Sequence, residues 1–595
     1  MNWDLTSFFP EFNGSEMKNF KADLQNDISD LLEKSSKMEI LSKQNAPQWE
    51  EVILKAEDLI ARHTHIESYV GCLSSCDANN EEYSREEASL ALVGAHFQKV
   101  EIEILRAIKN APEDVFKSFI KRPAFDGIEF YLERMLWSAR RTMSAEKERL
   151  SADLGVDGIG AWGRLYDNLS GKLTFEMVYP DGRRETLPIS QRRALMDDPD
   201  RSIRKAAFDG GNEAWQSMEH VCAAALNAIS GTRLTLYKHR SIEHFLDMAL
   251  FQSAISNDTL KSMFGAIKDN IEIPRRYLRL KAKMMSTDGV AWYDLGSEMP
   301  MPNMEKMPWP KGRQVVCRAF DNAYSSLGAF AREAYDRNWV EWEKRAGKRP
   351  GAFCTGSLLS KESRIFMTFN GTMGDVRTLA HETGHAFHSR VMREVRPLAH
   401  MYPMTLAETA STFAEMILTD NLLNDPELDN KAKCFILDQS LGNAAVYLMD
   451  IPVRFDFEKN FYEERSKGEI PVSRLKEMIT DTQRDIFGDV LLKGGEDPLF
   501  WASKLHFYIT GVSFYNFPYA FGFLLSQGLY AMFKKEGEDF LPKYEKLLKL
   551  SGSGTCEDVV KEGIGEDLKQ PEFWARAVKS QLPLIEQLEH MLKIN

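Results

Sequence analysis

Helical periodicity is the feature that most constrains this fold, because apolar residues recur at spacings of three and four along most of the chain. The pattern is clear in residues 19–32, extends from Glu16 to Lys147, and resumes after Pro199 to continue with breaks to Leu592. This spacing gives each helix one apolar face, which must be buried against a neighbour. The sequence therefore predicts a mainly α protein.

Two segments depart from the helical pattern and favour β structure. Between Trp162 and Pro188 the period shifts to alternation on either side of a Pro-Asp-Gly turn, which predicts a small β-hairpin. A short sheet is predicted for residues 351–371, because residues 364–370 alternate and carry β-branched and aromatic side chains. A loop rich in Met and Pro is expected at residues 299–310.

Length and charge narrow the class of protein. A single hydrophobic core stops growing near ~250–300 residues, so a chain of 595 residues is expected to form two or more packed lobes. The formal charge is −13, and the acidic residues are spread along the whole length. This charge argues against a nucleic-acid partner, whose phosphates require a basic face.

Cysteine usage and hydropathy predict a cytoplasmic protein. The seven cysteines are few, scattered and odd in number, which indicates reduced thiols rather than a disulfide framework. The first residues lack the basic and apolar regions of a secretory signal. Residues 509–533 carry no charge, but polar residues, a proline and three glycines interrupt them. We therefore expect a buried loop and helix there rather than a membrane span.

The segment His381-Glu382-Thr383-Gly384-His385 matches the H-E-x-x-H pattern. Positions i and i+4 of a helix share one face, so both imidazoles can reach one ion. Glu382 then lies beside the metal, where its carboxylate can take a proton from a bound water. A solvated helix face with two chance histidines is the alternative. A plausible helix start near Gly374, with no further proline until Pro397, favours the metal site.

Glu408 is the candidate for a third ligand. It lies 23 positions after His385, in a strongly helical segment. A catalytic zinc site takes three protein ligands and keeps one position for water, and two histidines with one glutamate are a common set. We therefore expect one Zn²⁺ per chain, held by His381, His385 and Glu408, because this donor set suits zinc better than manganese or cobalt.

Three more residues near the motif are candidates for supporting roles. Glu415 lies two helical turns beyond Glu408 and could accept a hydrogen bond from the free ring nitrogen of a ligating histidine. Asp375 is a second candidate for that role. An exposed carboxylate at Glu415 and a helix-capping charge at Asp375 are the alternatives. His388 is expected to pack or to support a ligand, because a fourth protein ligand would leave no room for water.

At these residues the chain resembles the oligoendopeptidase F branch of the thimet oligopeptidase family of zinc metallopeptidases. Members share His-Glu-x-Gly-His and then a helix with Glu, Ser three later and Glu seven later, matched here by Glu408, Ser411 and Glu415. The likeness extends to Trp3-Asp4-Leu5, to residues 364–372 and to residues 506–530. It thus covers nearly the whole chain.

In that family, a histidine and tyrosines of the late segment face the metal. The resemblance therefore implies that Tyr515 and Tyr519 donate to the oxyanion and that His506 contacts the substrate or the oxyanion. Gly511 could let this loop move over bound peptide. Core packing is the alternative for the aromatic run. The thimet branch has an additional tyrosine where this chain has Phe521-Gly522-Phe523, so the aromatic group that stabilises the oxyanion stays open.

The resemblance implies two helical lobes around a deep substrate channel, with a zincin-like catalytic core and a small β element. It divides the chain into an N-terminal helical region (1–115), a small oligoendopeptidase N-terminal-type region of helix and hairpin (116–195) and a catalytic metallopeptidase domain (196–595). Such a channel admits short, unstructured peptides and excludes folded proteins. The strand near residues 366–370, or its neighbour from Gly351, could pair with the substrate backbone.

The expected function is a zinc-dependent endopeptidase acting through metal-activated water. A peptidyl-dipeptidase or carboxypeptidase is an alternative, because helical zinc peptidases of those types also combine H-E-x-x-H with a later glutamate. A non-catalytic peptide-binding helical protein is a third reading, and Glu382 argues against it because a binder needs no general base. The sequence carries no pattern for cleavage preference, physiological substrates, oligomeric state or regulation.

Overall fold

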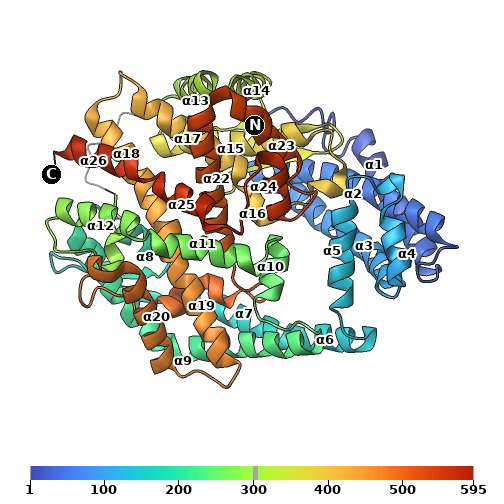
Figure 1. The fold of residues 1–595 in the computed structure, drawn as a ribbon, viewed down its shortest axis with the longest axis horizontal. Helices are drawn as coiled ribbons and strands as arrows, with labels where there is room; N and C mark the ends of the chain where they lie inside the picture. Colours follow the sequence, from blue (N-terminus) through green and yellow to red (C-terminus); the bar gives the residue numbers. More distant parts are fainter. Residues whose placement is uncertain (1, 299–305, 594–595) are drawn as a thin grey trace. The chain divides into compact units, whose positions relative to one another are not determined.

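The computed structural model describes residues 2–298 and 306–593, and Figure 1 shows that the fold is mainly helical, as predicted. Most of the predicted Met- and Pro-rich loop at 299–310 lies outside the described residues. The chain divides into two compact units. Unit 1 comprises Met1–Arg140, Met304–Asn424 and Met532–Glu566, and unit 2 comprises Arg141–Asn303, Asp425–Ala531 and Asp567–Asn595. The predicted division at residues 115 and 195 stays a prediction.

Unit 1 contains the N-terminal helices, a three-stranded sheet and the helix that carries the H-E-x-x-H motif. The apolar stripes of the N-terminal helices meet in a shared core, to which Leu24, Trp49 and Val100 belong. The elements of unit 1 are α1 (Ser15–Ser36), α2 (Ala46–Cys76), α3 (Glu81–Lys109), α4 (Glu113–Ile120), α5 (Glu129–Arg140), α13 (Trp309–Ala323), α14 (Ser325–Asp336), β3 (Val340–Glu341), β4 (Phe353–Ser357), β5 (Glu362–Phe366), α15 (Met373–Met392), α16 (Met404–Ala407), α17 (Thr409–Asn424), α23 (Leu541–Lys549) and α24 (Cys556–Ile564).

Unit 2 is helical apart from one β-hairpin. Its elements, with α22 ending in unit 1, are α6 (Ala145–Asp157), α7 (Ile159–Lys172), β1 (Thr174–Val178), β2 (Arg184–Pro188), α8 (Gln191–Met196), α9 (Arg201–His239), α10 (Asp247–Ser253), α11 (Asn257–Asp269), α12 (Glu272–Met284), α18 (Asn430–Ala445), the π-helix η4 (Val446–Asp450), α19 (Ile451–Arg465), α20 (Val472–Phe487), α21 (Phe500–Ser503), α22 (Phe517–Glu536), α25 (Pro571–Lys579) and α26 (Leu582–Leu592).

The predicted hairpin is confirmed in unit 2. Strands β1 and β2 pair antiparallel, and Phe175 faces Leu187 across the ladder. Phe175, Met177 and Leu187 are buried against α9, while the alternate residues of β1 are exposed. The alternation in the sequence therefore reflects one buried and one solvated face.

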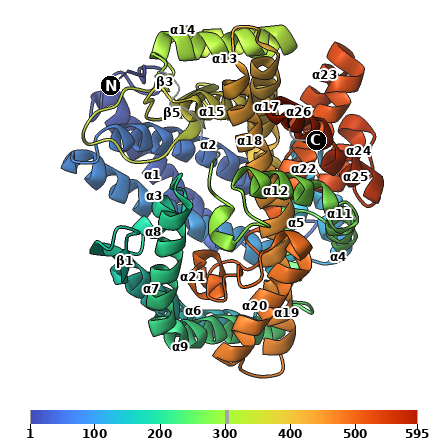
Figure 2. The same cartoon turned by 90° about the vertical axis from the view of Figure 1, so that its left-hand side faces the viewer.

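The predicted short sheet is confirmed in unit 1, where it lies beside α15 (Figure 2). The strand order is β3-β5-β4, with β4 antiparallel and β3 parallel to β5. Strand β3 was not predicted, because two residues are too few for an alternation to be visible. The chain leaves β5 at Phe366 and enters α15 at Met373, so the sheet sets the start of the motif helix.

The uncharged segment forms a loop followed by α22, as predicted. Within residues 2–298 and 306–593, none of the helices combines the length and the apolar character that crossing a bilayer requires. All seven cysteines are free thiols, which agrees with the expectation from their spacing.

Candidate metal centre

Helix α15 begins with a capping box that fixes the position of the motif. Thr372 Oγ1 accepts a hydrogen bond from the Asp375 N–H at 3.1 Å, and Asp375 Oδ2 accepts one from the Thr372 N–H at 2.9 Å. Asp375 Oδ2 also accepts from the Asn370 N–H at 2.9 Å. The carboxylate of Asp375 is thus engaged by main-chain donors, and it is a cap rather than a partner for a ligating histidine.

Glu408 lies at a break that the helical pattern did not predict. Helix α16 ends at Ala407 and α17 begins at Thr409, so Glu408 is the junction between them. Ser411 Oγ donates to the main-chain oxygen of Glu408 at 3.1 Å and to its carboxylate Oε2 at 2.7 Å. Such local side-chain bonds compete with the helical ladder. Here they also hold the carboxylate in one orientation.

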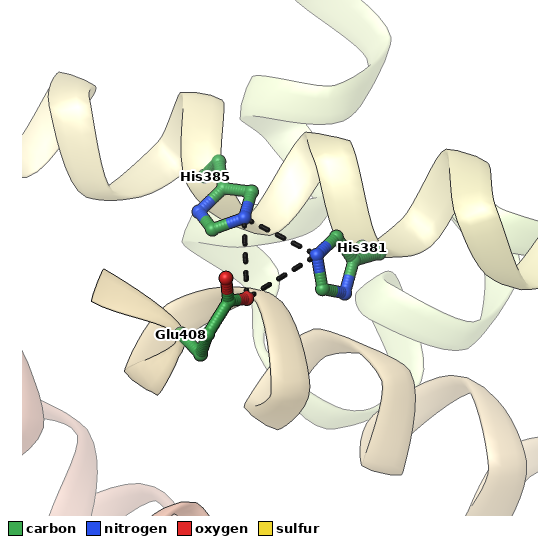
Figure 3. A group of neighbouring side chains, drawn as sticks. All are labelled: His381, His385 and Glu408. Carbon is green, nitrogen blue, oxygen red and sulfur yellow. Dashed lines mark hydrogen bonds and ion pairs between the residues drawn. The ribbon is translucent and has the colours of Figure 1, made fainter. Parts of the chain in front are cut away.

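The three predicted ligands converge, as Figure 3 shows. His381 Nε2 lies 3.2 Å from His385 Nε2 and 3.3 Å from Glu408 Oε2, and His385 Nε2 lies 3.4 Å from the same oxygen. Two ligands that each bind a tetrahedral zinc at 2.0–2.1 Å are about 3.3 Å apart. The triangle therefore has the size that one zinc ion requires. In the described part of the chain, no other group of three or more His, Cys, Asp or Glu side chains could hold a metal.

Close packing of two helices brings Glu408 to the histidines. A Cβ added at Gly384 would lie 2.6 Å from the Ala410 carbonyl oxygen and 2.7 Å from the Ser411 Cα. Only glycine lets α15 and α17 approach to this distance. The glycine within the motif is thus required by packing, and the packing sets the position of the third ligand.

Glu415 lies where the supporting role was predicted. Its Oε1 is 2.5 Å from His381 Nδ1, and Arg377 binds the other carboxylate oxygen. A carboxylate at Nδ1 keeps the hydrogen there and leaves Nε2 free for a metal. Arg377 was not predicted, although its position four residues before His381, on the same helix face, is a signal that could have identified it.

The charges of this cluster favour a bound cation. Burial alone would lower the pKa of His381, but Glu408 and Glu415 outweigh it and raise that pKa to about 10. Burial alone would raise the pKa of Glu408, but hydrogen bonds and charges of His381 and His385 hold it far below its usual range. Glu408 and Glu415 thus favour positive charge at this cluster, and either a proton on His381 or a bound cation would supply it.

Glu382 lies between the two histidines on α15 and is only 6% exposed. Burial raises the pKa of its carboxyl group, while the charges of His381 and His385 oppose that shift. Burial raises the pKa of the Cys354 thiol on β4, and the negative charge of Glu382 raises it further. The carboxylate therefore lies within electrostatic reach of both the metal ligands and the edge strand.

His388 is buried one turn beyond His385 and is not a fourth ligand. Its Nε2 donates to the Leu548 carbonyl at 3.2 Å and lies 3.1 Å from Ser551 Oγ. Its ring stacks on Tyr402 with centroids 4.8 Å apart. Burial lowers the pKa of His388 to about 4, so the ring is neutral. It connects α15 to the end of α23 and to Ser551 just after that helix, which is the packing role expected for it.

The three predicted residues of the late segment lie together in unit 2. Tyr519 donates a hydrogen bond to the Tyr515 hydroxyl at 3.1 Å, and the His506 and Tyr515 rings have centroids 5.1 Å apart. The predicted metal ligands belong to unit 1. That these side chains face the metal therefore stays a prediction.

The loop before these tyrosines is anchored by residues that sequence reasoning missed. The Phe514 N–H donates to the buried Glu458 carboxylate at 2.8 Å. Gly511, at the exposed centre of the loop, has no neighbour that would obstruct a side chain. Arg233 Nη2 donates at 2.8–3.1 Å to three main-chain carbonyls of the loop, those of Ile509, Thr510 and Val512. No local pattern indicates Arg233, because 276 positions separate it from Ile509.

Two family models match this chain. Residues 319–580 match the model described as "Peptidase family M3", and residues 108–175 match the one described as "Oligopeptidase F". The first match includes the candidate metal ligands and the late segment. The second lies before it in the chain and ends within β1.

Named relatives cover most of the chain. Oligopeptidase PepF of Bacillus subtilis is 22% identical over 99% of this chain and 87% of that protein. The chromosomal oligoendopeptidase F of Lactococcus lactis subsp. cremoris is 26% identical over 72% of this chain and 70% of that protein.

Solved structures share the fold. A crystal structure from Chlamydophila abortus has a TM-score of 0.89 and 20% identity, and the match covers 99% of this chain and 98% of that one. Oligoendopeptidase-F from Enterococcus faecium has a TM-score of 0.68 and 19% identity, with coverage of 97% and 100%. At these identities the structural likeness concerns the fold alone.

Proposed function

Since this chain belongs to the oligoendopeptidase F branch of peptidase family M3, we propose that it hydrolyses short, unstructured oligopeptides with one zinc ion. Membership in the family makes it a metalloendopeptidase. The observation that carries the proposal is the triangle of His381, His385 and Glu408, whose edges of 3.2–3.4 Å suit a tetrahedral zinc.

A zinc ion in this site would supply Lewis acidity, polarising the scissile carbonyl and acidifying water. Glu382 acts as the general base: its carboxylate accepts the proton that the attacking water gives up and then returns it to the leaving amine. Burial raises the pKa of Glu382, which makes the carboxylate a stronger base near neutral pH. Glu415 holds His381 in the tautomer that leaves Nε2 available.

Residues of the late segment supply further groups that contact the substrate. Tyr515, supported by Tyr519, donates its hydroxyl hydrogen to the carbonyl oxygen on which negative charge develops, and His506 contacts the substrate. Removing one such donor costs about 10²–10³ in rate. The enzyme works in the cytoplasm, which fits its seven free cysteines.

The deciding experiment maps cleavage sites in a mixed peptide library by mass spectrometry, with and without a chelator. We expect internal cuts in short peptides that disappear on chelation and return with zinc. Glu382→Gln should bind zinc yet lose nearly all turnover, while Glu394→Gln, an exposed glutamate just beyond α15, should match the wild type. Substantial hydrolysis by Glu382→Gln would remove Glu382 from the role of base.

A peptide blocked at both ends separates the alternative activities. An endopeptidase cleaves it at an internal bond, whereas a carboxypeptidase or peptidyl-dipeptidase leaves it intact. An intact blocked peptide alongside cleavage of its unblocked form would therefore overturn the endopeptidase proposal.

A further inference from the structure

A row of polar side chains in unit 2 ends on His506. The π-helix η4 ends at Asp450, whose two carboxylate oxygens both accept hydrogen bonds from Arg454, from Nε at 3.1 Å and from Nη2. Arg454 Nη1 donates to Asn516 Oδ1 at 3.0 Å. The same Oδ1 lies 2.6 Å from His506 Nδ1. We call Asp450, Arg454 and Asn516 the relay.

The relay determines which ring nitrogen of His506 carries hydrogen. A guanidinium group can only donate hydrogen bonds, so the Asn516 atom that faces Arg454 must be the carbonyl oxygen. That oxygen can only accept, so His506 Nδ1 must donate to it. Asn516 is 2% exposed, and a flipped amide would turn its NH2 group toward the Arg454 guanidinium, so that two donors would face each other. His506 is therefore the tautomer with its hydrogen on Nδ1.

The second ring nitrogen is then an acceptor. Burial lowers the pKa of His506; the hydrogen bond with Asn516 opposes this effect, and the charges of Lys504 and Arg454 add to the lowering. The ring is thus neutral near pH 7, and Nε2 presents a lone pair. A neutral ring in this tautomer has no hydrogen at Nε2 to donate to an oxyanion.

Tyr515 places a hydrogen-bond donor next to this acceptor. The Tyr515 hydroxyl oxygen accepts a hydrogen bond from Tyr519 at 3.1 Å, so the hydrogen of the Tyr515 hydroxyl is left for a different acceptor. None of the residues that the structure describes accepts it. The rings of His506 and Tyr515 meet edge to face with centroids 5.1 Å apart. One acceptor beside one donor matches a peptide group, which offers an N–H and a C=O.

We propose that Asp450, Arg454 and Asn516 are positioning residues that hold His506 as the Nδ1–H tautomer, so that its Nε2 accepts a hydrogen bond from a main-chain N–H of the substrate. Tyr515 donates to a carbonyl of the same peptide segment. The inference rests on the proposed function, which supplies the peptide. It gives His506 a role in substrate alignment and leaves the oxyanion to Tyr515 and the metal.

The tautomer is tested without any turnover by ¹⁵N NMR of the zinc-loaded protein with labelled histidines, using His506→Ala to assign the signal. We expect a hydrogen on Nδ1 and a bare Nε2 in the wild type. Asn516→Leu and Arg454→Met should shift the signal toward the other tautomer, while Asn516→Asp, which keeps an acceptor, should preserve it. Arg474→Met, which removes a matched surface ion pair with Glu464 between α19 and α20, is the control. A hydrogen on Nε2 in the wild type would overturn the inference.

The substrate contact is tested with depsipeptides, in which an ester oxygen replaces one non-scissile N–H at a time. We expect one position to lower kcat/KM by about tenfold in the wild type, the value of one lost hydrogen bond, and to have no effect in His506→Ala. Equal losses in both enzymes at every position would refute the contact. If the wild type fails to cleave the parent peptide, the proposed function fails instead, and the NMR result still decides the tautomer.

Discussion

Replacing Gly384 by alanine would push the motif helix away from Glu408, the proposed third metal ligand. The new Cβ would lie 2.6 Å from the Ala410 carbonyl oxygen, whereas an ordinary contact begins at 3.4 Å. Helices α15 and α17 would therefore have to separate by about 0.8 Å, the difference of these two distances. Glu408 directly precedes α17 and would move with it, so its distances of 3.3 and 3.4 Å to the histidines would lengthen toward 4 Å.

A tetrahedral zinc needs ligand pairs about 3.3 Å apart, so this separation should weaken binding by about 10–100-fold. A displacement near 1 Å at a catalytic centre also costs about 10² in rate. We expect kcat/KM for a quenched peptide to fall at least about 100-fold. Zinc affinity is measured by competition with a chelator. Global stability should change little, because the higher helix propensity of alanine, up to ~1 kcal/mol, offsets part of an overpacking cost of ~1–3 kcal/mol.

Gly374→Ala is the matched control on the same helix. A Cβ there would meet its nearest neighbour, Thr372 Oγ1, at 3.5 Å, which is an ordinary contact. This variant should bind zinc and cleave peptide like the wild type. If Gly384→Ala retained wild-type zinc affinity and rate with an unchanged circular dichroism spectrum, close packing of α15 and α17 would not be what positions Glu408.

Three further predictions concern residues around the site. Glu415→Gln should weaken zinc binding about 10–100-fold, and wild-type affinity in a chelator competition would contradict its proposed role. Tyr515→Phe should lower kcat by about 10²–10³ with full zinc content, and an unchanged kcat would exclude it as the oxyanion donor. His388 has a pKa of about 4 in the folded protein, below the value of about 6.5 in the unfolded chain. Between pH 6.5 and 4 the unfolded chain therefore binds a proton at this residue that the folded protein does not, and the free energy of unfolding decreases as pH falls. This amounts to about 2 kcal/mol at pH 5; His388→Gln should thus lose less Tm than the wild type between pH 7.5 and 5, and equal losses would contradict the assignment.

Short-range patterns in the sequence were sufficient for the helices, the hairpin and the pair of imidazoles. Periods of 3.6 and 2 residues follow from local geometry, so they can be seen in any window of the chain. The spacing of His381, Glu382 and His385 likewise requires nothing beyond one regular helix. Glu408 and Glu415 could be proposed because both lie within the next helical segment and match a family pattern.

Only the tertiary structure decided how those groups are oriented. The break at Glu408 and the close approach at Gly384 depend on contacts between two helices, which no single helical window contains. Glu415 rather than Asp375 supports His381, because packing across 34 positions brings it to Nδ1, while Asp375 is used by its own helix cap. The relay to His506 joins residues 62 positions apart. The sequence by itself thus determined which chemical groups are present and on which local element. Their hydrogen-bond partners were decided by long-range packing, because the burial of each group depends on neighbours from distant parts of the chain.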